Sequence, residues 1–217
     1  MLKKKSDIYN LVLIVCAFLM TIVLYNKLPD LVPIHWNASG EIDGYGPKIF
    51  GAFMAPVIMV FTWTGMKYLP NIDPRKENYE KFENSYSIIV NLLITFFLVL
   101  HVVTLLAALG YAVSVDKIIP LIVGILFIVI GNYLPKSKSN YFYGIKTPWT
   151  LSSDVSRRKT HRLGGILFIV SGVIIILSSF ILKGNAKVAA VMIATFVSVI
   201  VPLISSYIYA KNDSNKK

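Results

Sequence analysis

The residues best suited to chemistry lie in a polar stretch of the carboxyl-terminal half. Residues 157–165 read Arg-Arg-Lys-Thr-His-Arg-Leu-Gly-Gly. On a helix, Arg158, His161 and Arg162 share one face because they are spaced by three and four residues, and Gly165 follows on that face. Such a face can bind an anion or a peptide carboxylate. The same charges can instead anchor the chain at lipid headgroups, and the residues alone leave both interpretations open.

The residues before this face predict where its helix begins and how the chain approaches it. Residues 140–149 read Asn-Tyr-Phe-Tyr-Gly-Ile-Lys-Thr-Pro-Trp, an aromatic, turn-forming segment suited to a membrane interface. Pro148 favours an extended Thr147. The hydroxyl groups that follow predict a helix start near Ser152 or Ser153. Glycines 164 and 165 then allow another helix to approach closely.

A second group of polar residues lies in residues 27–48. Turn signals at residues 38–40 and 43–44 predict a short hairpin or a double turn. His35, Glu41 and Asp43 are conceivable metal ligands, but one His and two carboxylates on a turn-rich loop are a weak signal, and we expect no metal. The alternative is that Trp36 anchors the loop at the interface while His35 satisfies a backbone group. The residues singled out here are Pro33, His35, Trp36, Asn37, Gly40 and Asp43.

Two polar residues stand out inside the apolar runs, Asn91 and His101. Ionisable residues within a membrane usually serve ion or proton relays. A single histidine makes a poor relay, so we expect His101 to be neutral and hydrogen-bonded to a neighbouring helix. The scarcity of such groups argues against an active transporter.

The elements that position these residues are membrane-spanning helices. The 217 residues are 55% hydrophobic and only 15% charged, against roughly a quarter charged in soluble domains. Each of six apolar runs is long enough to cross a hydrocarbon core of about 30 Å. We therefore predict an all-α polytopic membrane protein with six transmembrane helices. The predicted spans are Ile8–Tyr25, Ile49–Met66, Ile88–Tyr111, Ile118–Leu134, Gly164–Leu182 and Val188–Ala210.

The basic residues predict the orientation. Most of the 22 Lys and Arg residues lie at the two ends and in the loops after the second and fourth spans. Both termini are therefore predicted to be cytoplasmic and the turn-rich loop 27–48 external. The net charge of +11 reflects this bias rather than nucleic-acid binding. The predicted units are a two-helix unit, residues 1–68, and a four-helix unit, residues 69–217, with a cytoplasmic loop 135–163.

The segment after the second span predicts its own helix. Asp73 and Pro74 suit a helix start, and Glu77 precedes Lys81 by four residues, the favoured order for a helical ion pair. We expect the third span to begin about three turns early, as a solvated helix end or a docking surface for a soluble partner.

At these motifs the sequence resembles a known family. Residues 143–153, Tyr-Gly-Ile-Lys-Thr-Pro-Trp-Thr-Leu-Ser-Ser, and residues 158–165 resemble the signature of the SdpI/YfhL family of bacterial membrane proteins. Residues 33–37, Pro-Ile-His-Trp-Asn, with Gly40 and Asp43, resemble the small amino-terminal domain that commonly precedes it. One departure is Arg157, at a position where the family pattern has an aromatic residue.

The resemblance implies a non-enzymatic immunity protein of the bacterial cytoplasmic membrane. Its partners would be membrane lipid, a secreted toxin peptide of the sporulation-delaying type and a soluble winged-helix autorepressor, with no cofactor and no direct contact with nucleic acid. Two alternatives are a permease or efflux carrier for a peptide or small solute, and a hydrolase using His161 or His35 as base. The residues expected to recognise toxin or partner are Thr147, Pro148, Trp149, Arg158, Lys159, Thr160, His161 and Arg162.

Overall fold

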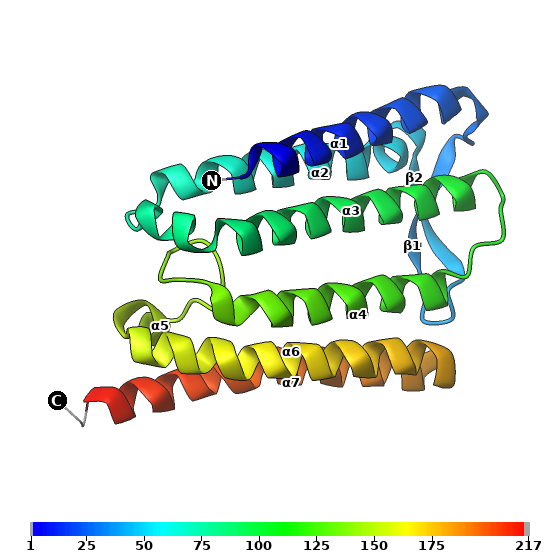
Figure 1. The fold of residues 1–217 in the computed structure, drawn as a ribbon. Helices are drawn as coiled ribbons and strands as arrows, with labels where there is room; N and C mark the ends of the chain where they lie inside the picture. The colour runs from blue at the N-terminus through cyan, green and yellow to red at the C-terminus, as the bar shows by residue number, and fades with distance from the viewer. Residues whose placement is uncertain (1, 215–217) are drawn as a thin grey trace.

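Six long helices and one small β-hairpin make up the fold (Figure 1). The structure, a computed structural model, describes residues 2–214. All six helices are long and apolar enough to cross a membrane, which confirms the predicted fold class. They are α1 (Lys4–Leu24), α2 (Lys48–Ile72), α3 (Glu83–Ala108), α4 (Val115–Tyr133), α6 (Asp154–Ile181) and α7 (Gly184–Ser214). The shorter elements are η1 (Tyr25–Lys27), β1 (Leu31–Trp36), β2 (Ile42–Pro47), η2 (Lys76–Phe82), η3 (Leu134–Lys136) and α5 (Pro148–Ser152).

The helices group three and three. Helices α1, α2 and α3 pack together, α6 packs against both α4 and α7, and α3 meets α4 where the two groups join (Figure 1). Helix α3 packs more extensively against α1 and α2 than against α4. The division of the chain at residue 68 into units of two and four helices stays a prediction.

Glycines bring α4 and α6 into close contact. A Cβ atom on Gly131 would lie 2.6 Å from the carbonyl oxygen of Gly165, and one on Gly172 would lie 2.6 Å from that of Gly124. Both helices carry their glycines seven residues apart, so the two approaches lie on one face of each helix. Small residues let helix backbones pack closely where lipid provides no hydrophobic drive.

The two ends of the bundle differ. Both termini lie at one end, which we call the terminal face, and the β-hairpin covers the other end, the hairpin face (Figure 1). This agrees with an even number of spans. Which face is cytoplasmic stays a prediction from the basic residues.

Residues 31–47 form the predicted hairpin. Strand β1 pairs antiparallel with β2, with Val32 opposite Gly46 and Pro33 opposite Tyr45. The register becomes irregular at His35. Val32 is fully buried and packs on Gly51 of α2, where a Cβ atom would lie 2.7 Å away.

The segment before α3 differs from the prediction. Residues 76–82 form the 3₁₀ helix η2, and the α-helix begins only at Glu83. In a 3₁₀ helix side chains three residues apart are aligned, and Lys81 accordingly donates to Asn78 Oδ1 at 2.8 Å rather than pairing with Glu77. The segment is also more than a solvated end, because Tyr79 and Phe82 are buried.

Candidate functional site

At the terminal face, an irregular loop lies between η3 and α5. We call residues 137–147 the signature loop. Asn140 is fully buried and organises its turn. Its Oδ1 accepts hydrogen bonds from the backbone N–H groups of Phe142 at 3.1 Å and Tyr143 at 2.6 Å. Its Nδ2 donates to the Lys138 carbonyl at 2.7 Å. The side chain thus supplies partners that a helix or sheet would otherwise provide.

Arg157 ties the signature loop to α6. Only 2% of this residue is exposed. Its Nη1 donates to the Asn140 carbonyl at 3.2 Å, and its Nη2 donates to the Tyr143 carbonyl at 2.9 Å. Its Nε has no hydrogen-bond partner among residues 2–214.

His161 makes the second tie, one helical turn further on. The ring is buried, and its Nε2 accepts a hydrogen bond from the Ile145 N–H at 3.1 Å. The other nitrogen, Nδ1, lies 2.9 Å from Ser137 Oγ and donates to it in this arrangement. With one nitrogen accepting, the imidazole is neutral. His161 is therefore a positioning residue for the loop.

The signature loop is also held from the side of α1–α3. Asp73 Oδ2 accepts from the Tyr79 hydroxyl at 3.0 Å and from the Tyr141 N–H at 2.8 Å. The Tyr143 ring stacks on Phe82 with centroids 5.9 Å apart. Burial raises the pKa of the Tyr143 phenol, so this group remains neutral. The loop therefore joins the two groups of helices.

Two helix caps follow the signature loop. Thr147 is extended and caps α5 in a reciprocal capping box with Thr150. Thr147 Oγ1 also lies 3.0 Å from Ser206 Oγ on α7. Ser153 caps α6 by accepting from the Ser156 N–H at 3.0 Å, which confirms the predicted helix start. Trp149 is 38% exposed and packs edge-on against Tyr207.

The residues of the predicted basic face differ in burial. Thr160 and His161 are buried, whereas Arg158, Lys159 and Arg162 are exposed. Arg157 and His161 lie on the face of α6 that packs against the signature loop. The cation buried beside His161 is therefore Arg157. The expectation that Arg158, His161 and Arg162 point at one region is therefore wrong. The family departure at Arg157 was the signal that could have identified this residue.

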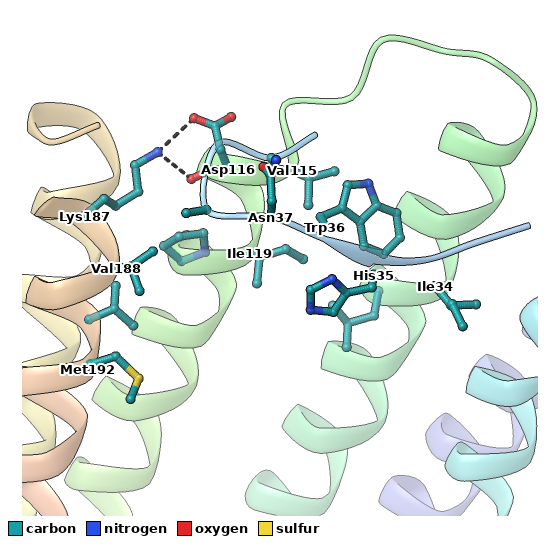
Figure 2. Close-up of a pocket in the computed structure, with 15 residues that line it drawn as sticks. Ile34, His35, Trp36, Asn37, Val115, Asp116, Ile119, Lys187, Val188 and Met192 are labelled. Carbon is teal, nitrogen blue, oxygen red and sulfur yellow. Dashed lines mark hydrogen bonds and ion pairs between the residues drawn. The ribbon is translucent and has the colours of Figure 1, made fainter. Parts of the chain in front are cut away.

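At the hairpin face, a pocket of about 410 Å³ lies between the hairpin and helices α3, α4 and α7 (Figure 2). Most of its wall is apolar, with Ile34, Ile119 and Val188 among the lining residues. One side is polar, where Lys187 Nζ donates to Asp116 Oδ2 at 2.8 Å and to the Asp116 carbonyl at 2.9 Å (Figure 2). Lys187 is only 4% exposed, so this is a largely buried ion pair.

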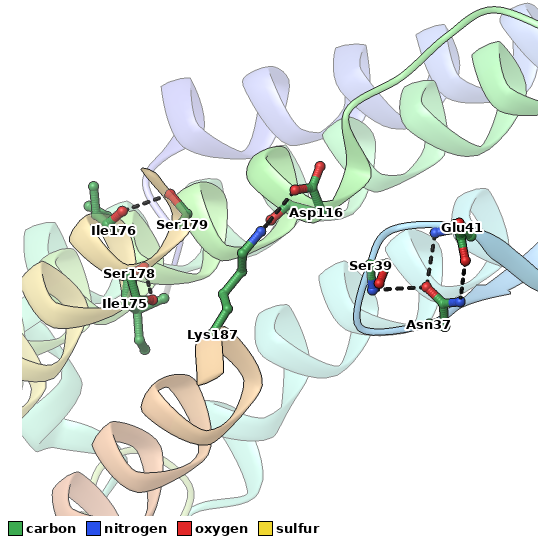
Figure 3. Close-up of polar contacts among 9 residues, drawn as sticks. All are labelled: Asn37, Ser39, Glu41, Asp116, Ile175, Ile176, Ser178, Ser179 and Lys187. Atoms are coloured by element: carbon green, nitrogen blue, oxygen red, sulfur yellow. Dashed lines mark hydrogen bonds and ion pairs between the residues drawn. The ribbon is translucent and has the colours of Figure 1, made fainter. Parts of the chain in front are cut away.

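The hairpin tip docks on the start of α4. Asn37 Oδ1 accepts from the N–H groups of Ser39 and Glu41, and its Nδ2 donates to Glu41 Oε2 at 2.9 Å (Figure 3). This turn presents Gly40 to Asp116, where a Cβ atom on the glycine would lie 2.8 Å from the Asp116 Cβ.

The conceivable metal ligands of the hairpin are engaged in separate contacts. His35 Nδ1 pairs with Asp43 Oδ1, whereas Glu41 bonds to Asn37. No group of three His, Cys, Asp or Glu side chains suited to a metal occurs in residues 2–214. Trp36 lines the pocket beside His35 (Figure 2).

The intramembrane polar residues connect helices. His101 Nε2 lies 3.0 Å from Thr21 Oγ1 and 3.2 Å from the Ala17 carbonyl, both on α1. This confirms the expected bond to a neighbouring helix. Asn91 Oδ1 accepts from the Ser6 hydroxyl, also on α1.

Comparison with known proteins finds matches for two parts of the chain, one that contains the hairpin and one that contains the signature loop. Residues 12–60 match the family described as Domain of unknown function (DUF1648), and residues 136–209 match the SdpI/YfhL protein family. The chain is 29% identical over 207 residues to "Immunity protein SdpI" of Bacillus subtilis (strain 168), covering 95% of this chain and 97% of the relative.

A second relative matches a shorter part. It is "Uncharacterized membrane protein YbgB" of Bacillus subtilis (strain 168), 39% identical over 51 residues, which cover 23% of this chain and 56% of the relative. No solved structure matches the chain. The six apolar helices and the near-full-length similarity identify a multi-pass protein of the bacterial cell membrane. Both motif regions thus match family models, DUF1648 over residues 12–60 and SdpI/YfhL over residues 136–209, which confirms the resemblance seen in the sequence.

Proposed function

We propose that this chain is an immunity protein that protects the cell from a secreted toxin peptide of the sporulation-delaying type. The observation that carries the proposal is the similarity to an immunity protein over 95% of this chain and 97% of that relative. Such coverage includes the hairpin, the signature loop and all six long helices. It favours protection over the permease or efflux carrier weighed from the sequence.

In this proposal the toxin is met at the hairpin face. The apolar wall of the pocket suits a hydrophobic peptide segment, because burial of apolar surface favours binding there. Leu100 of α3 and Ile119 of α4 both line the wall, so a bound segment would contact both groups of helices.

The terminal face would report occupancy to a soluble repressor on the cytoplasmic side. Trp149, Arg158 and Arg162 are exposed there and accessible to a soluble partner. The glycine contacts between α4 and α6 connect the two faces, because α4 borders the pocket and α6 carries the exposed basic residues. Sequestration of the repressor at the membrane is thus the second step of this proposal, after protection from the toxin.

The test is protection of a toxin-sensitive bacterial host. Cells producing the full chain are exposed to the toxin peptide, and survival and membrane potential are measured. We expect producing cells to keep both. Unchanged killing at verified membrane expression contradicts the proposal.

A matched pair of variants tests the pocket. Ile119→Trp fills the pocket, whereas Ile125→Trp adds the same ring to an exposed position on the same helix. We expect the first variant to lose protection by about tenfold or more, equivalent to about 1.4 kcal/mol of binding, and the second to retain it. Equal protection by both variants would place toxin recognition elsewhere.

Signalling to the repressor is tested with a readout separate from protection. Alanine variants of Trp149, Arg158 and Arg162 are expected to release a fluorescent repressor from the membrane while protection persists. His161→Ala is expected to impair both readouts, since the imidazole positions the signature loop. Normal repressor localisation in all four variants would exclude this part of the terminal face from the reporting step.

A further inference from the structure

A second pocket lies at the terminal face, between η2, the signature loop and the start of α6. Its volume is about 330 Å³. Four cationic side chains line it, those of Lys81, Lys138, Arg157 and Arg158. The single carboxylate among the lining residues is that of Asp154. The pocket therefore has a strong excess of positive charge.

The lining cations lack carboxylate partners. Within residues 2–214, the ion pairs closer than 4.0 Å are His35–Asp43, Lys67–Asp7 and Lys187–Asp116. None of these involves the pocket. Four positive charges beside a single carboxylate still repel one another on balance, so an anion in the pocket would stabilise them.

Arg157 makes this argument specific. It is only 2% exposed, and buried charges in proteins are normally paired. Its Nη atoms donate to the carbonyl oxygens of Asn140 and Tyr143, which are neutral acceptors. Its Nε is left without a partner among the described residues. A buried guanidinium that forms no ion pair, in a residue that lines a cationic pocket, points to an anionic ligand.

The other lining groups indicate the kind of anion. Ser137, Ser139 and Asn78 add neutral hydrogen-bonding groups to the wall. An oxyanion with several acceptor oxygens can use guanidinium, ammonium and hydroxyl donors together, and guanidinium groups suit phosphate particularly well.

We propose that this pocket binds a phosphate group, either that of an anionic phospholipid or free inorganic phosphate. Helix α6 begins at Asp154 and its apolar run only near Leu163. The pocket therefore lies at the height where headgroups meet a membrane-spanning helix. This site is independent of toxin binding, and its test uses no toxin.

The experiment measures thermal unfolding of the full chain purified in detergent, followed by tryptophan fluorescence. Two probes are used: sodium phosphate against sodium chloride at equal ionic strength, and phosphatidylglycerol against diacylglycerol with the same acyl chains. A ligand at roughly ten times its Kd should raise the Tm by about 3–6 °C.

Two double variants with the same change of charge provide the comparison. Lys138→Gln/Arg158→Gln removes two exposed cations of the pocket, and Lys136→Gln/Lys146→Gln removes two exposed cations outside it. We expect the pocket variant to lose more than half of the shift and the control to keep it. Arg158→Gln alone should give an intermediate loss, which guards against misfolding of the double variant.

The outcomes separate the two sources of phosphate. A shift with inorganic phosphate identifies a site for the free anion, and a shift with phosphatidylglycerol alone identifies a lipid headgroup site. No shift with either probe, or equal shifts in the two double variants, overturns the proposal.

Discussion

The two faces of the bundle are organised by different means. At the terminal face, buried polar side chains fasten an irregular loop, with Arg157, His161 and Asn140 each making at least two hydrogen bonds. At the hairpin face, the hairpin tip lies against Asp116 of α4, and the ion pair between Asp116 and Lys187 connects α4 to α7 beside an open apolar pocket.

This difference separates a rigid end from an adaptable one. A buried polar network with most partners satisfied fixes one geometry, because each broken bond leaves an unpaired group. An apolar pocket makes no such directional demand on what fills it, because hydrophobic burial is non-directional. The hairpin face is thus suited to admit a ligand, and the terminal face to maintain the shape of a surface.

The largest effect is expected from Arg157→Leu. This change leaves the carbonyl groups of Asn140 and Tyr143 without their charged donor. We expect the free energy of unfolding to fall by about 2–4 kcal/mol. The measurement is unfolding of the purified chain in detergent, by heat or by titration with a denaturing detergent.

Arg158→Leu is the matched control. It removes the same charge from the next residue of α6, but the side chain is exposed, so a change within about 0.5 kcal/mol is expected. Equal losses in the two variants would show that the terminal face is not held by its buried guanidinium.

A smaller effect is expected at the hairpin face from Lys187→Met. It removes the ammonium group that pairs with Asp116 while keeping much of the buried chain length. Because the Asp116 side chain is 27% exposed, water compensates part of the loss, and we expect about 1–2 kcal/mol. Hydrogen exchange should rise in the hairpin and at the start of α4. Lys183→Met, at an exposed position just before α7, is the control, and comparable exchange in both variants would contradict the role of the ion pair.

Much of the fold was predictable from the sequence because lipid leaves few options. Runs such as Ile49–Met66 are too apolar and too long for other structures, and α2 contains that run. The turn residues around Gly40 similarly predicted the hairpin. The 3₁₀ form of η2 was missed, because burial of Tyr79 and Phe82 decides it and is a tertiary effect.

The site was harder to predict because helical phase alone does not say which face is buried. The spacing of Arg158, His161 and Arg162 is correct for a shared face, but packing turns His161 inward and both arginines outward. Arg157 is buried because the signature loop offers it two carbonyl groups. The contact between Gly40 and Asp116 joins distant parts of the chain, and local patterns do not encode it.

The smallest expected effect tests that contact through two glycines with the same backbone geometry. Gly40 and Gly110 have φ angles of +82° and +85°, so alanine at either position carries a strain of about 1 kcal/mol. At Gly110 the new methyl group meets nothing within 4 Å, whereas at Gly40 it meets Asp116 at 2.8 Å. Gly40→Ala should therefore destabilise the chain by about 1 kcal/mol more than Gly110→Ala. Because the strain cancels between the variants, the difference in unfolding free energy reports the docking of the hairpin on α4. Equal losses of unfolding free energy in the two variants would mean that the hairpin tip moves away from Asp116 at no cost. The ion pair between Asp116 and Lys187 would then be the remaining polar contact at that face.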